Sequence, residues 1–151
     1  MFAAAKQHDV TATSPAGAAD HLRILIVEDD RVIGFLLSEM LTDLGHEVCG
    51  IERSENGAVD AAFRVMPDLM IVDAQLAGGT GAGVMARILS RRSMPHLFMS
   101  GLPMTNLAGG VVSLLKPFSE DALEQGIQHS VAGWHRGGTR PPLLQRPSES
   151  N

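Results

Sequence analysis

The chain has 151 residues, 44% of them hydrophobic, which is enough for one domain with a complete core. Its formal net charge of −5 argues against a protein that binds the nucleic-acid backbone, because such proteins are usually basic. No stretch approaches the roughly 18 consecutive apolar residues of a membrane helix, so we expect no membrane span. A single cysteine cannot form an intrachain disulfide, and we therefore expect a reducing, cytoplasmic location.

Composition divides the chain into three parts. Residues 1–20 are rich in Ala, Thr, Ser, Pro and Gly and show no periodicity, which predicts a disordered N-terminal arm. Residues 21–132 contain all the periodic segments and are predicted to form one domain. Residues 133–151 are again Gly, Pro, Ser and Arg without a period, which predicts a disordered C-terminal tail.

Strands and helices are predicted to alternate along the central part. Short apolar runs bounded by turn residues predict five strands, at residues 22–27, 47–51, 69–72, 96–99 and 111–115. Apolar residues at helical spacing predict helices over 32–44, over 54–66 after a Ser54 cap, from Gly81 or Gly83 to about 92, and over 119–132. Such alternation is typical of an α/β fold with a doubly wound parallel sheet and right-handed crossovers.

Chemically useful side chains stand at the ends of several predicted strands. Glu28 and Asp29 follow the first strand, Asp73 ends the third, Ser100 ends the fourth and Lys116 ends the fifth. Because the carboxyl ends of parallel strands share one edge, and open α/β proteins bind ligands at that edge, we expect these side chains to meet there. Asp73 lies centrally among them.

The predicted cluster has the parts needed for phosphoryl chemistry. Two carboxylates about 4 Å apart repel each other by roughly 4 kcal/mol at an effective dielectric near 20, so three of them require a cation. Oxygen ligands without His or Cys suit Mg²⁺ rather than zinc. An Asp beside such a metal can act as a nucleophile toward a phosphoryl group, with Lys116 and Ser100 offsetting the charge on the phosphoryl oxygens.

Four motifs together resemble the receiver domain of two-component response regulators. They are ILIVEDD, PDLMIVD, the Ser-Gly pair after the fourth strand, and LLKPF, and the likeness spans residues 22–132. The resemblance implies a flavodoxin-like, doubly wound five-stranded parallel sheet. It also implies a role for six residues: Glu28 and Asp29 as the acidic pair that binds Mg²⁺, Asp73 as phosphoacceptor and metal ligand, Gln75 as a metal ligand through its backbone carbonyl, Ser100 as switch hydroxyl, and Lys116, before a cis Pro117, as the phosphate-binding lysine.

The resemblance also implies a function and its partners. A receiver of this kind takes a phosphoryl group from a histidine kinase or a histidine phosphotransfer protein. It then signals by contacting a downstream protein target or by passing the phosphoryl group on. It is a self-phosphorylating acceptor rather than an enzyme, and no output domain is recognisable after it, which predicts a stand-alone receiver.

Three positions depart from the usual pattern of that family. The aromatic residue expected three positions before the lysine is Ser113, and the usual proline after the phosphoacceptor is Ala77. The segment between Ser100 and Lys116 is short and contains Pro103 and Gly109-Gly110, so its helix should be short or absent.

Three alternatives remain to be weighed. A phosphatase of the haloacid dehalogenase type needs a second Asp two residues after the first, and Gln75 stands there, which cannot transfer protons. Dinucleotide binding through GGTGAG fails because the required third glycine is replaced by Val84. The third alternative is a receiver fold that binds proteins without being phosphorylated, which Ser113 and the shortened segment favour and the intact acidic set opposes.

Overall fold

The computed structural model describes residues 21–137, in which a parallel sheet separates two pairs of helices. The predicted N-terminal arm and most of the predicted C-terminal tail lie outside the described residues. Among the described residues, no helix is both long and apolar enough to cross a membrane.

The sheet contains five parallel strands in the order β2-β1-β3-β6-β7. This is the doubly wound, flavodoxin-like order, so the predicted fold class is confirmed. Each strand falls within one or two residues of its predicted position. The strands are β1 (Arg23–Val27), β2 (Glu47–Glu52), β3 (Leu69–Asp73), β6 (His96–Ser100) and β7 (Val112–Leu115).

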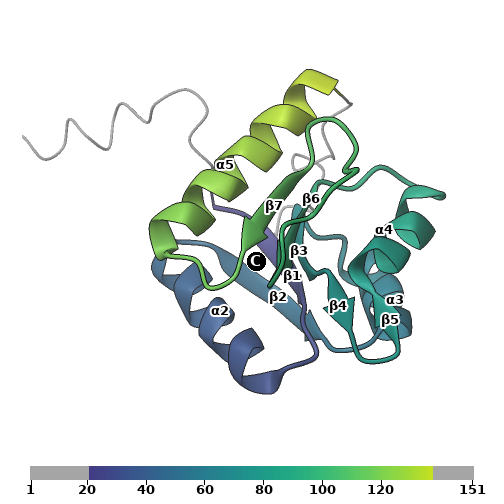
Figure 1. Cartoon of the computed structure of the whole chain (residues 1–151), viewed down its shortest axis with the longest axis horizontal. Coiled ribbons are helices and arrows are strands. Elements are labelled where there is room, and N and C mark those ends of the chain that lie inside the picture. Colours follow the sequence, from purple (N-terminus) through teal and green to yellow (C-terminus); the bar gives the residue numbers. More distant parts are fainter. Residues whose placement is uncertain (1–20, 138–151) are drawn as a thin grey trace, which may run out of the picture.

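Two layers of helices cover the faces of the sheet (Figure 1). The helices α2 (Arg31–Asp43) and α5 (Glu120–Gly137) bury one face through side chains such as Ile24, Ile71 and Leu97. The helices α3 (Glu55–Val65) and α4 (Gly81–Leu89) cover the other face, where the core includes Met70 and Val72. Because both faces of the central strand β3 are covered, all five of its residues are buried, which explains its continuous apolar sequence.

Side-chain caps fix where the helices begin. Ser54 accepts a hydrogen bond from the Gly57 amide (3.0 Å), and Ser119 accepts one from Ala122 (3.0 Å), so both predicted caps are confirmed. Thr80 caps α4 by accepting from the Gly83 amide at 2.9 Å, which places the start of that helix at Gly81.

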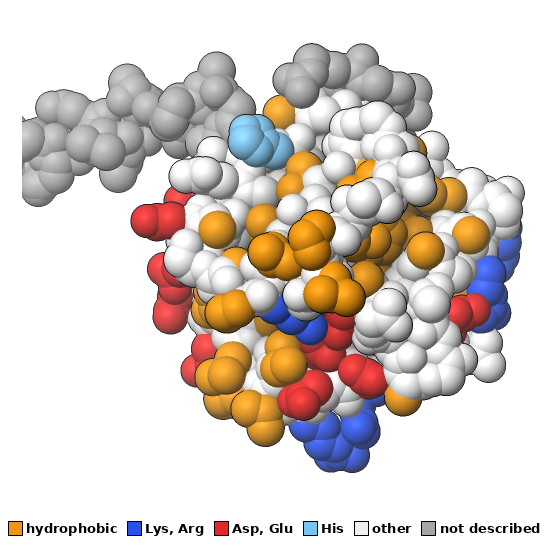
Figure 2. Space-filling view, in the orientation of Figure 1, with side chains coloured by type: hydrophobic (Ala, Val, Ile, Leu, Met, Phe, Trp, Pro, Cys, Tyr) orange, Lys and Arg blue, Asp and Glu red, His pale blue; other side chains and the backbone are white. Residues whose placement is uncertain are grey.

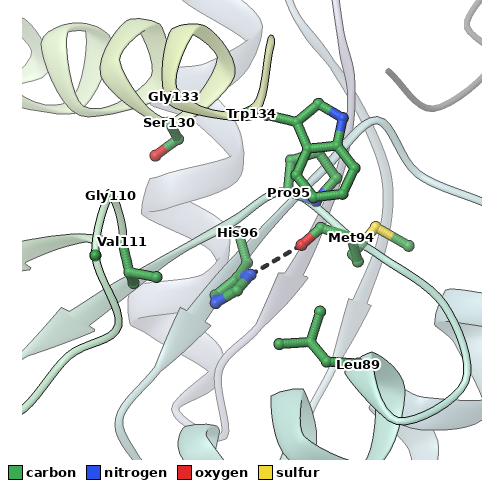
Figure 3. Close-up of a pocket in the computed structure, with 10 residues that line it drawn as sticks. Leu89, Met94, Pro95, His96, Gly110, Val111, Ser130, Gly133 and Trp134 are labelled. Carbon is green, nitrogen blue, oxygen red and sulfur yellow. Dashed lines mark hydrogen bonds between the residues drawn. The ribbon is translucent and has the colours of Figure 1, made fainter. Parts of the chain in front are cut away.

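The helix α5 differs from its prediction. It continues to Gly137 instead of ending near Ala132, so the first residues of the predicted tail are helical. Trp134 in the added turn lies beside Pro95 and Met94, which precede β6 (Figure 3). Contact with these residues gives the helix an apolar surface to pack against, which the composition of the segment did not reveal.

Two connections between elements lie on the α3–α4 side of the sheet. Residues 101–111, between β6 and β7, contain no helix, in agreement with the expectation from Pro103 and Gly109-Gly110. A small hairpin of β4 (Gln75–Leu76) and β5 (Gly79–Thr80) follows β3, and it was not predicted. Gly78 in its turn has φ +80°, which explains the need for glycine there.

Candidate phosphoacceptor site

The site lies where β1, β3 and β7 end at the same edge of the sheet. The register pairs Val27 with Val72, so Glu28 and Asp73 are the next residues along two hydrogen-bonded neighbouring strands. Carboxylate oxygens of Glu28, Asp29 and Asp73 all lie within 4.8 Å of one another. The predicted convergence of these three acids is therefore present in the structure.

Lys116 bridges two of the acids from the end of β7. Its Nζ donates to Asp73 Oδ2 at 2.9 Å and to Glu28 Oε1 at 3.0 Å. Burial alone would lower the pKa of Lys116, but the hydrogen bonds to Asp73 and Glu28 outweigh it and the pKa is raised. Lys116 therefore stays charged and partly neutralises the acids. Figure 2 shows basic and acidic side chains next to each other in the middle of this face.

Glu28 is the most deeply buried of the three acids, with 1% of its surface exposed. The pKa of Glu28 is raised to about 7, chiefly by burial and also by the nearby Asp73 carboxylate, while hydrogen bonds from the Asp30 amide and Lys116 act in the opposite direction. A group that holds its proton near neutral pH is a weak nucleophile. Glu28 therefore suits a structural or ligating role better than attack on phosphorus.

Asp73 is held in the same way as Glu28, with one oxygen on Lys116 and the other on the backbone amide two residues further along the chain. Oδ2 accepts from Lys116, and Oδ1 accepts from the backbone amide of Gln75 at 3.1 Å. One oxygen thus faces a cation and the other an N–H group, and these two donors fix the orientation of the carboxylate. Gly81 packs directly against this residue, because a Cβ there would overlap the Asp73 carbonyl oxygen.

Asp29 is held by a contact that the sequence did not predict. Its Oδ2 accepts from the Ala77 amide at 2.7 Å, which joins the acid to the turn of the β4–β5 hairpin. The Gly78-Gly79 pair was the available signal for that turn, but nothing in the sequence points to the hydrogen bond. Asp30, the third acid of the run, caps α2 by accepting from the Val32 and Ile33 amides at 2.9 and 3.0 Å.

Ser100 and Gln75 lie at the same edge as the acids. Ser100 is the last residue of β6, and its Oγ accepts from the Leu102 amide at 3.1 Å. Its carbonyl accepts from the Lys116 amide at 2.8 Å, just before the cis Lys116–Pro117 bond. Gln75 is exposed in β4, with its amide on Asp73. The switch role of Ser100 and the metal-ligand role of the Gln75 carbonyl stay predictions.

The donor set fits a hard divalent cation. Three carboxylates offer oxygen atoms, and neither His nor Cys belongs to the cluster, which matches the preference of Mg²⁺ for oxygen ligands. Glu28, Asp29 and Asp73 are the residues that would hold the ion.

Comparison with known proteins defines the class. The response regulator receiver domain family matches residues 24–128, and this chain belongs to that family. Membership agrees with the sheet order and the acidic cluster, and it implies a partner histidine kinase. The dehalogenase and dinucleotide-binding alternatives are accordingly set aside.

Particular relatives are regulators from several bacteria. The chain is 32% identical over 126 residues to the transcriptional regulatory protein PdtaR of Mycobacterium tuberculosis, covering 80% of this chain and 62% of that protein. It resembles the response regulator PhyR of Brucella abortus with a TM-score of 0.73 at 27% identity, covering 83% of this chain and 54% of that one. The receiver domain of Erythrobacter litoralis PhyR gives a TM-score of 0.67 at 26% identity, covering 74% of this chain and 91% of that one. The chain thus spans less than two thirds of PdtaR.

Proposed function

We propose that this chain accepts a phosphoryl group on Asp73 from a phosphohistidine of a histidine kinase or histidine phosphotransfer protein, and signals by contact with a target protein or by passing the group on. The observation that carries the proposal is the bridge from Lys116 to Asp73 and Glu28 within a cluster of three carboxylates. The cytoplasmic location expected from the sequence belongs to the same proposal.

The transfer is an exchange of one bond for another. An oxygen of Asp73 attacks phosphorus, an O–P bond forms, and the N–P bond of the donor histidine breaks, with the imidazole nitrogen keeping the electron pair and taking up a proton. Mg²⁺, when bound, offsets charge on the phosphoryl oxygens. Lys116, which already donates to Asp73, can redirect an N–H to a phosphoryl oxygen, and Ser100 can donate its hydroxyl proton to another.

A protein donor is supported by an exposed apolar surface next to the site. Four large side chains of the first turns of α2 are exposed: Val32 by 66%, Ile33 by 38%, Phe35 by 60% and Leu36 by 55%. They form the α2 patch, which Figure 2 shows beside the acidic side chains. Exposed apolar clusters of this kind mark protein-binding surfaces.

A groove continues the α2 patch to the lysine. It has a volume of about 230 Å³ and is formed by Ile33, Leu36, Leu37 and Met40 of α2 with Lys116, Pro117 and Phe118. A helix of the donor packed along this groove would bring its phosphohistidine toward Asp73. The proposal therefore assigns the α2 patch to the phosphodonor.

Treatment with acetyl phosphate and Mg²⁺, followed by intact mass measurement, tests the chemistry. We expect a gain of about 80 Da, the mass of one phosphoryl group, that requires the divalent cation. Asp73→Asn should remove it, while Asp60→Asn, at an exposed position of α3, is the matched control and should keep it. A gain of the same mass in Asp73→Asn would refute the assignment.

The same experiment decides the second candidate function, a receiver fold that binds proteins without phosphorylation. Ser113 in place of the usual aromatic and the lack of a helix in residues 101–111 favour that candidate. If the second candidate is correct, the wild-type chain should gain no mass even when calorimetry shows that Mg²⁺ fills its site.

A further inference from the structure

A cavity of about 250 Å³ lies at the end of the sheet opposite to Asp73. It opens among the last residues of α4, the starts of β6 and β7, and the last turns of α5 (Figure 3). Its apolar walls are formed by Leu89, Met94, Pro95, Val111 and Trp134. An engineered apolar cavity of about 150 Å³ is known to hold benzene, so this one has room for a molecule with a six-membered ring.

His96 is one of three side chains in the wall that carry a polar atom, with Ser130 and Trp134. Its Nδ1 lies 2.9 Å from the Met94 carbonyl oxygen, and because a carbonyl can only accept, Nδ1 carries the proton. Burial lowers the pKa of His96, so the ring is neutral near pH 7 and its other nitrogen, Nε2, has only a lone pair to offer. Nε2 lies on the side of the ring away from Met94 (Figure 3), and no described residue donates to it.

Ser130 is the second polar side chain, and it too can only accept. Its Oγ donates its proton to the Gly126 carbonyl at 2.8 Å within α5, which leaves the oxygen lone pairs. None of the described residues that line the cavity is Lys, Arg, Asp or Glu, so a charged molecule would lose its hydration without gaining an ion pair. The wall therefore presents apolar surface and two acceptors, together with the indole N–H of Trp134, a buried donor that has no hydrogen-bond partner among the described residues.

We propose that this cavity binds a small, largely apolar, uncharged molecule that carries a hydroxyl or N–H donor, such as a phenol. The ring packs against Trp134 and the aliphatic side chains, and the donor bonds to His96 Nε2. The β6 strand separates His96 from Ser100 by four residues, about 13 Å of extended chain, so the ligand does not touch the phosphoacceptor site.

Titration of the ¹⁵N-labelled chain with three probes tests the proposal. Trp134 is the only tryptophan, so its indole N–H gives a single NMR signal. Phenol should shift this signal saturably, with a Kd of about 1 mM or tighter. Toluene has the same shape without the donor and should bind about threefold to tenfold more weakly, the loss expected for one hydrogen bond. Benzoate, which is charged, should not saturate.

Two variants separate the acceptor from the cavity. His96→Phe should weaken phenol binding by the same factor of about three to ten and leave toluene binding unchanged. The matched control is His129→Phe, at an exposed position of α5, which should change the binding of neither probe. Leu89 is 44% exposed, so Leu89→Trp is expected to fold normally. Its larger side chain should fill the cavity and remove the binding of both probes. Binding to this variant is measured from the proton signals of phenol. Equal affinity for phenol and toluene, unchanged phenol binding in His96→Phe, or no saturation would overturn the proposal.

Discussion

Gly81 stands where the end of β3 leaves no room for a side chain. A Cβ at this position would overlap the Asp73 carbonyl oxygen and lie 2.9 Å from a methyl group of Val72. The Gly81 amide also donates to the Ala74 carbonyl at 3.0 Å, which draws the start of α4 against the strand. The glycine thereby fixes the backbone that carries Asp73.

We predict that Gly81→Ala lowers the free energy of unfolding by about 1–3 kcal/mol, as overpacking of a filled core does. Gly101→Ala is the matched control, because its added Cβ meets nothing within 4 Å and should change stability by less than about 1 kcal/mol. Urea unfolding of both variants measures the difference. Equal midpoints for the two would show that the backbone at Gly81 can move aside at little cost.

His46 gives the fold a dependence on pH. It is buried, and its Nδ1 accepts from the Leu22 amide at 3.1 Å, which requires that nitrogen to be unprotonated. Burial lowers the pKa of His46 below its usual value near 6.5, the nearby His21 lowers it further, and Glu124 acts in the opposite direction. The stability that this histidine contributes is therefore complete above about pH 6.5 and is lost as the pH falls below that value toward the folded pKa.

Glu28, whose pKa is raised to about 7, acts on stability in the opposite direction, so the contribution of His46 is predicted as a difference: between pH 7.5 and pH 5.5 the wild type loses free energy of unfolding relative to His46→Gln. One histidine cannot account for more than about 1.4 kcal/mol per pH unit. His129→Gln, at an exposed position, should keep the wild-type dependence. Urea titrations at the two pH values measure the free energy of unfolding. An identical pH dependence in the wild type and His46→Gln would exclude His46 as a source of it.

The residues of the candidate site were predictable to different degrees. Glu28, Asp29, Asp73 and Lys116 follow from strand ends, because parallel strands deliver their carboxyl ends to one edge. The Ala77–Asp29 bond could not be predicted, since a backbone N–H leaves no trace in the residue type. The sequence also could not show that the pKa of Glu28 is raised, because that shift comes chiefly from burial.

At the scale of elements, the sequence predicted where the helices and strands lie along the chain better than which of their side chains pack against the sheet. The five strands and four helices of the domain follow from apolar spacing, caps and glycines. The end of α5 and the β4–β5 hairpin were missed, and α4 ends at Leu89 instead of near residue 92. The helical period of α2 placed Ile33 and Leu36 with the apolar residues, yet both are exposed. Periodicity detects a helix but does not say which part of a wide apolar stripe the sheet covers.

The segment between β6 and β7 limits how far a signal can travel. A hydrogen bond from Ser100 to a phosphoryl group contributes about 1.5–3 kcal/mol, whereas moving an equilibrium from 1:99 to 99:1 takes about 5.5 kcal/mol. Ser113 has no ring to add a packing contribution. We predict that beryllofluoride with Mg²⁺ shifts the NMR signals of amides near Asp73 and in residues 101–110, and leaves those around Ser113 little changed. Large shifts confined to β7 and α5 would reveal a relay through another route.

The α2 patch should affect phosphoryl transfer from a protein donor but not from acetyl phosphate. We predict that Phe35→Ser slows phosphoryl transfer by about tenfold or more when the donor is a histidine kinase that phosphorylates the wild type. The reason is that exposed aromatic side chains at an interface carry much of the binding energy. The rate with acetyl phosphate should stay the same. Leu89→Ser, an exposed apolar position on α4, is the matched control for both donors. A loss of the acetyl phosphate reaction in Phe35→Ser would instead indicate damage to the site.

At the scale of the whole molecule, a cation in the acidic cluster should stabilise the fold. Binding to the native state alone adds about 2.7 kcal/mol at a Mg²⁺ concentration of 100 times Kd. We predict that Mg²⁺ raises the Tm and that a chelator reverses the rise. Asp29→Asn can still accept from the Ala77 amide but loses a charged ligand, so its Tm should respond much less. Scanning calorimetry makes the comparison, and an equal rise in the variant would place the ion elsewhere.

The two ends of the sheet carry different chemistry. The carboxyl ends of the strands gather charged side chains, whereas the cavity beside Trp134 at the other end is mainly apolar, with uncharged polar groups on His96, Ser130 and Trp134. Only the first could be predicted, because it follows from single residues at strand ends. The cavity depends on how α4 and α5 end beside the start of β6, which no local pattern encodes.

Ala77 contributes to the acidic cluster through an atom that almost every amino acid carries. Its side chain is exposed, and its N–H is the group that holds Asp29. Polar, charged and apolar residues at this position would all keep that N–H, whereas the proline that is usual there in the family has none, so Ala77→Pro would remove the hydrogen bond to Asp29. The contact between residue 77 and Asp29 is made by the backbone, and it stays invisible to any comparison that scores side chains by their chemistry.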